Sequence, residues 1–260
     1  MSIQQYYRFA AITYLNGSIA ALIPVMIVVI PLSILSHGKE VVWTALPFIL
    51  YSLVSYQSYL LNHDRSLEID KSVPEDDNLS LRSKDKYLLM FMPAPSLRML
   101  LFSPKGAILG EIRDARYLKL RWFLPYFLDR FIPAEYGLYN VNNELVMKVQ
   151  WKRDRANVYD SNGNLRVKIE EQERNKYSIQ FFNQAFSIIV QSERLFTDIQ
   201  FKNTNRKTIG RVRKGWMPLE WDAFFKDANT PVLSFDDDLS EEERSIVLAL
   251  LVKIYRYRNH

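Results

Sequence analysis

The sequence predicts a mainly β protein, in which a closed antiparallel barrel of β-hairpins surrounds a buried C-terminal helix and two transmembrane α-helices precede the barrel. Residues 1–62 hold two long apolar runs, and residues 85–260 contain segments in which apolar and polar side chains alternate. Because successive side chains of a strand point to opposite faces, such alternation indicates half-buried strands. The chain therefore divides into a membrane hairpin (1–62), a polar linker (63–84) and one folded domain (85–260).

The two apolar runs cover residues 19–35 and 41–61. Each is close to the roughly 20 residues that a helix needs to cross a hydrocarbon core of about 30 Å. The charged residues of the first 62 positions are only Arg8, Lys39 and Glu40. A cleaved signal peptide is the alternative, but no small-residue cleavage site follows Leu35 and a second apolar run begins soon afterwards. We therefore expect an uncleaved hairpin.

The positions of basic residues predict the orientation of the hairpin. The turn at 36–40 is nearly neutral, whereas Arg8 precedes the hairpin and several Lys and Arg residues follow it. The positive-inside rule then places both ends, and the folded domain, on the cytoplasmic side of the cell membrane, in a multi-pass arrangement. The apolar runs contain Pro24, Pro31 and Pro47, which are expected to kink the helices.

Composition excludes several classes of function. The net charge is +5, of which the hairpin contributes +1, so the remainder carries a mild excess of +4. This excess suits a domain near anionic lipid, but it lacks the concentrated basic stripe of a nucleic-acid-binding protein. The chain contains no cysteine, which excludes disulfides, thiol catalysis and cysteine metal sites.

Strand and turn signals follow one another along the folded domain. Alternation is clear in four segments, 145–151, 165–170, 177–181 and 197–202. Clusters of turn-forming residues lie at 103–106, 140–143, 160–164, 203–205 and 227–229. Short strands joined by such turns predict an antiparallel meander of hairpins.

The segment 239–258 interrupts this meander and predicts a helix. It opens with Ser240 and three glutamates, a capping box with acidic residues in the first turn, and its middle is apolar on every side. A helix that is apolar all round must be enclosed by protein or lipid. Its apolar part spans roughly 16 Å, about half a bilayer, so we expect the sheet to close around it.

Two phrases and the order of elements resemble the Tubby C-terminal, LURP-one-related and phospholipid scramblase superfamily. The phrases are 158–165 and 207–216, and they precede 222–224, 231–233 and the closing helix. The resemblance covers residues 86–260 and is strongest after Val158. It implies a barrel around a central helix that engages anionic lipid headgroups or a neighbouring membrane protein. Scramblases carry their membrane segment at the C-terminus, so scrambling activity is not implied for this chain.

The residue inventory argues against an enzyme. The three histidines, His37, His63 and His260, lie outside the interior of the folded domain, which removes serine–histidine triads and histidine zinc sites. Glycine-rich phosphate loops are absent. We therefore predict no catalytic residue, no cofactor and no metal.

Two groups of carboxylates remain. Glu170 and Glu171 are expected to be solvated at the end of an exposed strand. Asp236, Asp237 and Asp238 precede the terminal helix, where the scramblase resemblance would suggest calcium. Stabilisation of the positive helix start is the favoured interpretation, because calcium needs six to eight oxygen ligands and EF-hand spacing is absent.

The segment 116–127 places cations beside aromatic residues, as in an interfacial lipid contact. The predicted lipid-binding residues are Arg116, Lys119, Arg121 and Trp122. A buried sheet segment with a solvated edge is the alternative. A second basic group is explained by ordinary outward strand faces and consists of Arg206, Lys207, Arg211, Arg213 and Lys214.

These observations predict a membrane-anchored, non-enzymatic binding or regulatory module. Its expected partners are the lipid bilayer, anionic phospholipid headgroups or a membrane protein, and not nucleic acid. An immunity or stress-resistance protein that acts through its membrane hairpin is the alternative. A third hypothesis, an enzyme that uses carboxylates, is disfavoured because the histidines lie outside the domain.

Overall fold

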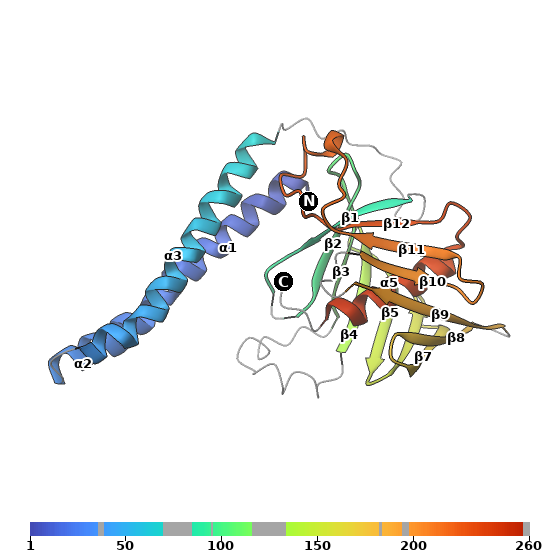
Figure 1. Ribbon diagram of the computed structural model, residues 1–260, viewed down its shortest axis with the longest axis horizontal. Helices are drawn as coiled ribbons and strands as arrows, with labels where there is room; N and C mark the ends of the chain where they lie inside the picture. The colour runs from blue at the N-terminus through green and yellow to red at the C-terminus, as the bar shows by residue number, and fades with distance from the viewer. Residues whose placement is uncertain are drawn as a thin grey trace. The chain divides into compact units, whose positions relative to one another are not determined.

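The computed structural model describes residues 1–35, 39–69, 85–94, 96–115, 134–181, 184–193 and 198–256. The chain forms two compact units, Met1–Ser72 and Val73–His260 (Figure 1). The first unit is helical and the second is a β-barrel, and each is described by itself.

The first unit is a pair of long helices. Its elements are α1 (Ile3–Pro24), the π-helical turn η1 (Val25–Val29), α2 (Ile30–Leu35) and α3 (Lys39–Glu68). Ser2 caps α1, because its hydroxyl accepts from the backbone amide of Gln5 while the Gln5 side chain accepts from the amide of Ser2. The expected disturbance at Pro24 is present, since the α-helix gives way there to η1. Helix α3 continues past Asn62, its expected end, to Glu68.

Small residues line the contact between α1 and α3. The two helices run antiparallel, because the hydroxyls of Ser18 and Ser52 are 3.0 Å apart and the Gln4 amide donates to the carbonyl of Ser66 over 3.1 Å. The other small buried side chains of the pair are Ala10, Ala11, Ala21, Ala45 and Ser55. Along most of its length the hairpin thus buries small and hydroxyl-bearing residues, whereas the large residues Ile3, Tyr6 and Tyr7 are buried at the start of α1.

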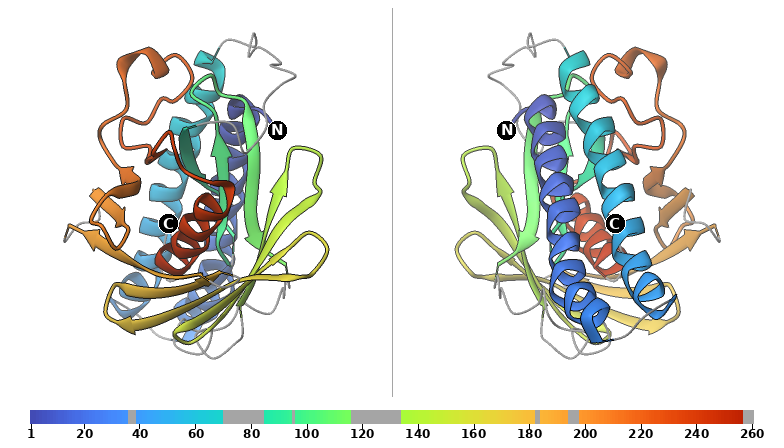
Figure 2. Two further views of the ribbon diagram at one scale, coloured as in Figure 1. Left: turned by 90° about the vertical axis from the view of Figure 1, so that its right-hand side faces the viewer. Right: turned by 90° about the vertical axis from the view of Figure 1, so that its left-hand side faces the viewer.

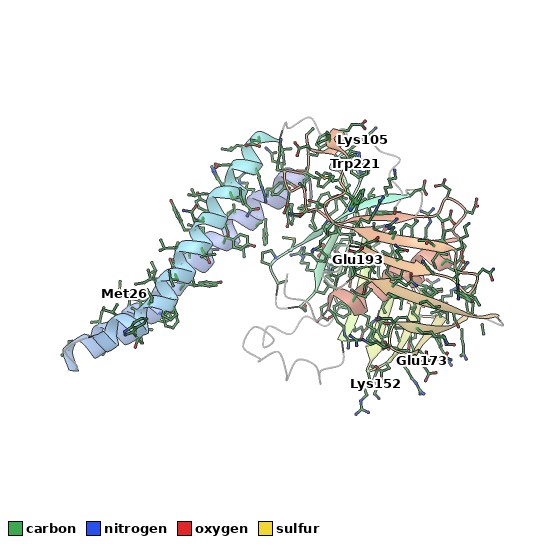
Figure 3. The ribbon with its side chains drawn as sticks, viewed as in Figure 1. Met26, Lys105, Lys152, Glu173, Glu193 and Trp221 are labelled. Atoms are coloured by element: carbon green, nitrogen blue, oxygen red, sulfur yellow. The ribbon has the colours of Figure 1, made fainter. Side chains whose placement is uncertain are left out.

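Large apolar side chains cover the outside of the same helices. Trp43, Leu53 and Val54 of α3 are exposed, as are Ile19 of α1 and Met26 of η1, which projects from the hairpin in Figure 3. The polarity of the hairpin is therefore the reverse of that of a water-soluble protein, whose large apolar residues are buried.

One helical stretch in the described residues is long and apolar enough to cross a membrane. It covers Ile3–Ile27, 25 residues within which a window of 18 residues has a mean hydropathy of 1.7. Helix α3 is long enough but not apolar enough over such a length, because serines, tyrosines and Gln57 interrupt its apolar run. Two membrane-spanning helices were expected, and one of them meets this criterion in the described residues.

The described residues of the second unit form a closed barrel in which each strand pairs antiparallel with the next and β1 pairs with β12 (Figures 1 and 2). The strands are β1 (Lys86–Phe91), β2 (Arg98–Phe102), β3 (Ile108–Asp114), β4 (Ala134–Asn140), β5 (Leu145–Lys152), β6 (Arg155–Asp160), β7 (Leu165–Glu173), β8 (Lys176–Phe181), β9 (Gln184–Ser192), β10 (Asp198–Lys202), β11 (Thr208–Arg213) and β12 (Val232–Phe235). The predicted closed antiparallel barrel is confirmed.

One turn design recurs at the end of the barrel where β3, β5, β7 and β11 begin. In each turn the first residue donates its backbone amide to the carbonyl four residues later, and the fourth residue has positive φ. The positive-φ residues are Gly106, Asn143, Gly163 and Arg206. Turns with one left-handed residue match the twist of antiparallel hairpins. The sequence signals for these four turns are confirmed.

Helix α5 (Glu241–Tyr255) lies inside the barrel, and its apolar residues form a single core with the inward side chains of the strands (Figure 2). The predicted capping box is present, since the Ser240 hydroxyl accepts from the backbone amide of Glu243 and the Glu243 carboxylate accepts from that of Ser240. The buried Trp151 indole donates to the Ala249 carbonyl over 3.2 Å. The predicted central helix is confirmed, with shorter bounds than expected.

The outer face of β1 and β2 is also buried. Leu88, Leu100 and Phe102 alternate with core residues and are fully buried. Phe225, in the loop between β11 and β12, packs its ring edge-on against Phe102 at 6.1 Å between centroids. This second covered face explains why β1 reads as a continuous apolar run without alternation.

Candidate functional site

A pocket of about 270 Å³ opens at the end of the barrel where α5 begins. Apolar side chains from β1, β4, β5, β6, β7 and α5 line it, among them Tyr87, Leu138, Met147, Val158, Val167 and Leu248. These residues come from six separate elements. Alternation along each strand predicts that they point inward, but the sequence does not show that they leave a space.

Asp160 and Arg166 form one side of the pocket rim. The Asp160 carboxylate accepts from the backbone amides of Asn162 and Asn164, within the turn between β6 and β7, and from the Arg166 guanidinium over 2.9 Å. The Asn164 amide, together with Arg166, holds the pKa of Asp160 below its ordinary value despite partial burial. Asp160 is therefore a fixed anion that orients Arg166.

The first turns of α5 form the other side of the rim. Arg244 is largely buried, donates to the Asp85 carboxylate over 2.9 Å and lies over the Phe235 ring at 5.3 Å. Glu241 and Glu242 are exposed beside it. Apolar walls with a rim of both charges can hold a small amphipathic group, and the size lies at the lower limit of ligand pockets.

Lys253 closes the opposite end of the barrel. Its ammonium forms ion pairs with Glu171 and, at 3.9 Å, with Asp154, and it lies 4.9 Å from the ring centroid of Trp151. Burial raises the pKa of Glu171, but the hydrogen bonds from Lys253 and from the Asn175 amide outweigh burial and hold this pKa below its ordinary value. This cluster fixes the last turn of α5 to the barrel.

The expectation that Glu170 and Glu171 are both solvated is therefore wrong for Glu171. Glu170 points outward and pairs with Arg155 over 2.6 Å, whereas Glu171 is mostly buried against α5. Val167 and Ile169 face the barrel interior, so the alternation of β7 turns Glu171 inward as well and leaves Glu170 on the outer face.

The carboxylates before α5 serve as partners of a lysine. The ammonium of Lys207 lies 2.5 Å from Asp236 and 3.8 Å from Asp238. The hydrogen bond to Asp236 raises the pKa of Lys207. Within the described residues no group of three or more potential ligands could hold a metal ion.

The second basic group does not form one patch. Arg206 and Lys207 lie in the turn before β11, whereas Arg213 and Lys214 lie at its far end. Between them, Arg211 forms an ion pair with Asp198 of the neighbouring strand. Strand β11 thus carries these cations to opposite ends of the barrel.

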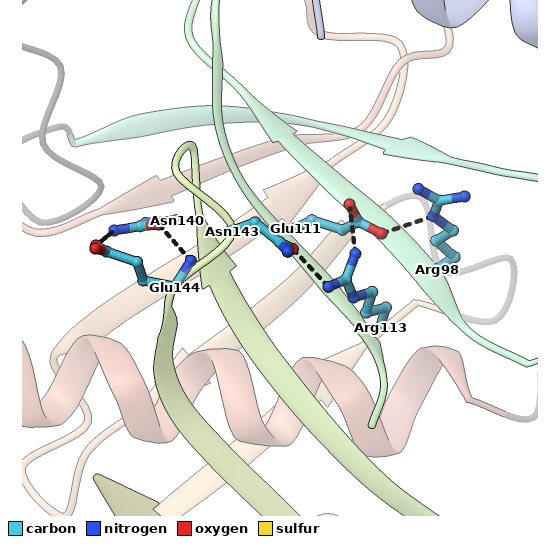
Figure 4. A network of polar contacts seen from close by, with 6 residues as sticks. All are labelled: Arg98, Glu111, Arg113, Asn140, Asn143 and Glu144. Atoms are coloured by element: carbon cyan, nitrogen blue, oxygen red, sulfur yellow. Dashed lines mark hydrogen bonds and ion pairs between the residues drawn. The ribbon is translucent and has the colours of Figure 1, made fainter. Parts of the chain in front are cut away.

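The polar surface over β2, β3 and the following hairpin consists of charges that neutralise one another (Figure 4). Arg98 donates to Glu111 over 2.6 Å, and Arg113 donates to the Asn143 side chain over 2.6 Å. The Arg113 guanidinium also lies over the Tyr139 ring at 4.1 Å. This surface is therefore occupied by internal contacts.

The loop between β11 and β12 carries the most exposed apolar side chains of the described barrel. Leu219 is 90% exposed and Trp216 is 66% exposed, and the Arg213 guanidinium lies 5.3 Å from the Trp216 ring. The residues Leu219–Trp221 form a short 3-10 helix, η3. A cation beside an exposed tryptophan is typical of a membrane interface. The loop is contiguous in the sequence, but its exposed apolar residues are not among the predicted lipid-binding residues.

The predicted lipid-binding residues Arg116, Lys119, Arg121 and Trp122 lie outside the described residues. The strand before them, β3, runs in the same direction as β11 and ends at the same end of the barrel. The loop after Arg213 therefore begins at the end of the barrel at which β3 ends.

Comparisons with known proteins add one finding. No family model matches the chain, and no curated protein matches it. A protein from Arabidopsis thaliana, solved by X-ray crystallography, is similar to the chain with a TM-score of 0.42 and 9% sequence identity, over 66% of this chain and 91% of that chain.

Proposed function

We propose that this chain is a membrane-anchored, non-enzymatic binding or regulatory module of the Tubby-like class, whose barrel engages anionic lipid headgroups on the cytoplasmic side of the membrane. A membrane protein is the alternative partner. The closed barrel around a central helix supports the class. The observation that carries the proposal is the reversed polarity of the helical hairpin.

Reversed polarity favours a lipid environment for both helices. Exposure of Leu53, Val54 and Trp43 to water would forgo about 25 cal/mol per Å² of apolar surface, whereas lipid removes that cost. Hydrocarbon supplies no hydrogen-bond partner, and Ser18 and Ser52 supply one to each other. Small residues at the helix contact are likewise typical of membrane helices. We therefore propose that α3 spans the membrane together with α1.

The lipid contact is proposed for the end of the barrel at which β3 and β11 end. The exposed pair Trp216 and Leu219 would enter the interface, while Arg213 and the cations of 116–121 would face lipid phosphates. Each cation near an anionic surface contributes about 1 kcal/mol and is screened by salt. Several weak contacts suffice because the hairpin already holds the barrel near the bilayer.

The absence of cysteine allows a clean test with a single label. The full chain with Leu219→Cys, carrying an environment-sensitive dye, is reconstituted in neutral and in anionic nanodiscs. We expect blue-shifted emission in anionic discs, reversed at 1 M salt, where the screening length is about 3 Å. The matched control is Leu165→Cys, an exposed leucine at the opposite end of the barrel, which should show no shift.

The predicted site residues are tested in the same assay. The combined change Arg116→Gln, Lys119→Gln and Arg121→Gln should reduce the anionic shift of the dye at position 219 without altering thermal unfolding of the barrel. An unaffected shift would remove these three residues from the site. Equal emission in neutral and anionic discs would contradict lipid engagement and favour a protein partner.

Topology is tested separately. Reporter fusions at Ser2 and at His260 should both report the cytoplasm, because two spans return the chain to its starting side. Opposite compartments would show that α3 does not cross the membrane.

A further inference from the structure

Asn16 is a polar residue on the outer surface of α1. It lies in the stretch Ile3–Ile27, two residues before Ser18, whose hydroxyl contacts that of Ser52 near the middle of the apolar run 41–61. At a rise of 1.5 Å per residue, about 12 Å of helix separate it from Arg8, the nearest charged residue in the sequence of this helix. Its side chain is exposed, and the described part of the chain offers its amide no hydrogen-bond partner.

Two other polar side chains of the hairpin, Thr13 and Asn62, behave differently. The Thr13 hydroxyl donates to the Phe9 carbonyl over 3.0 Å, and the Asn62 amide donates to the Ser58 carbonyl over 2.8 Å. Both are therefore satisfied within their own helix. Asn16 is short and central, so it cannot reach the interface as a long side chain would.

The residues around Asn16 form a heptad stripe on the face of α1 that points away from α3. Spacings of three and four alternate along the exposed residues Phe9, Ile12, Asn16, Ile19 and Ile23. Such spacing presents one seam to a neighbouring helix, and a single asparagine in such a seam sets the register and the number of helices. In hydrocarbon, an amide is stabilised only by another polar group at the same depth.

We propose that two copies of this chain associate in the membrane through this stripe, with Asn16 of one copy hydrogen-bonded to Asn16 of the other. Because both copies insert with the same topology, their α1 helices are parallel and residue 16 meets residue 16 at equal depth. The amide carries both donors and an acceptor, so it is complementary to itself across a two-fold axis. The inference rests on the proposed function in that it requires α1 to lie in the bilayer.

The test measures association of the full chain in lipid vesicles. Leu165→Cys chains labelled with donor or acceptor dye are mixed, and energy transfer is followed as lipid dilutes the protein. Asn16→Val should weaken association about 3- to 30-fold, the range given by interhelical hydrogen bonds of membrane helices. Asn16→Gln keeps the amide and should restore part of the transfer.

The matched control is Gln57→Val, which removes an exposed amide from α3 and should leave transfer unchanged. Equal transfer in wild type and Asn16→Val, or equal loss in both valine variants, would overturn the proposal. Alkaline extraction of the vesicles separates the two hypotheses. A chain that is extracted contradicts the membrane anchor itself, whereas a chain that stays inserted and does not associate contradicts only the pairing through Asn16.

Discussion

The hairpin and the barrel are built on opposite arrangements of the same residue types. The hairpin buries Ser18 and Ser52 and exposes Leu53, whereas the barrel buries Leu250 and exposes charged side chains such as Glu173 (Figure 3). Since burial follows the solvent, the contrast supports the proposal that lipid surrounds the hairpin and water surrounds the barrel. It explains why whole-chain averages, such as a charged fraction of 24%, describe neither part.

Polar groups inside the two units are satisfied in different ways. In the hairpin two neutral hydroxyls bond to each other, while in the barrel the ammonium of Lys253 meets Glu171 and Asp154. A charge can be kept inside the barrel because its mouth admits partial solvation, with Asp154 largely exposed. From this comparison we expect that substitutions which change charge or side-chain volume reduce stability most strongly in the barrel.

The largest expected effect comes from a charge inside the barrel. Leu251→Asp places a carboxylate where the side chain is fully buried in the shared core of α5 and the strands. An uncompensated buried charge costs about 3–5 kcal/mol, which is comparable with the stability of a whole domain. We expect the barrel to unfold, as measured by near-ultraviolet circular dichroism and limited proteolysis of the full chain.

Leu165→Asp is the control for this change, because Leu165 is an exposed leucine of the same barrel. It should alter the free energy of unfolding by less than about 0.5 kcal/mol. Native-like unfolding of Leu251→Asp would show that α5 is not central to the barrel.

The next effect concerns the cluster at the end of α5. Lys253→Met leaves the mostly buried Glu171 without its cation and should lower the free energy of unfolding by about 2–3 kcal/mol. Adding Glu171→Gln to Lys253→Met should recover part of this loss, because the uncompensated anion is removed. Denaturant unfolding of the wild type, the two single variants and the double variant gives a double-mutant cycle. If the changes in the free energy of unfolding were fully additive, this would contradict the ion pair.

The same pair gives the barrel a pH dependence with a defined sign. The pKa of Glu171 is lower in the folded state than its ordinary value near 4.3, so the folded state binds the proton less tightly than the unfolded state. The stabilisation is present above the ordinary pKa and is lost as the pH falls through the lower folded pKa. Stability of wild type should therefore decrease below about pH 4 more steeply than that of Glu171→Gln.

Periodicity and turn chemistry were sufficient to predict the half-buried strands and the capped helix. Strands such as β5 and β7 alternate because one face meets α5 and the other meets water, and Ser240 caps α5 as its sequence indicates. Strand β1 was not predicted, because both of its faces are covered and the alternation disappears. Alternation of apolar and polar residues identifies a strand that is buried on one face, but it does not identify a strand that is buried on both faces.

The candidate sites depend on contacts between distant residues. Arg166 and Arg244 meet at one pocket although they are far apart in sequence, and Glu171 finds Lys253 through the fold. Sequence spacing carries no signal for such pairs, whereas the apolar and basic loop around Trp216 is readable as a continuous phrase. Residues of a site that are distant in sequence can therefore be predicted only once the topology is known, whereas residues that follow one another in sequence can be predicted without it.

The smallest expected effect compares two glycines, one in each unit. A Cβ on Gly210 of β11 would lie 3.1 Å from a methyl carbon of Val247 in α5, whereas a Cβ on Gly17 of α1 would meet only the Tyr51 hydroxyl, at an ordinary 3.7 Å. Gly210→Ala should therefore cost about 1 kcal/mol through overpacking of the barrel core. Gly17→Ala should be neutral or stabilising, since alanine favours the helix by up to about 1 kcal/mol. Thermal unfolding of the barrel and hydrogen exchange of α1 in nanodiscs measure the two changes. Equal losses would mean that the hairpin is packed as tightly as the barrel, and the contrast between the units would then be one of polarity alone.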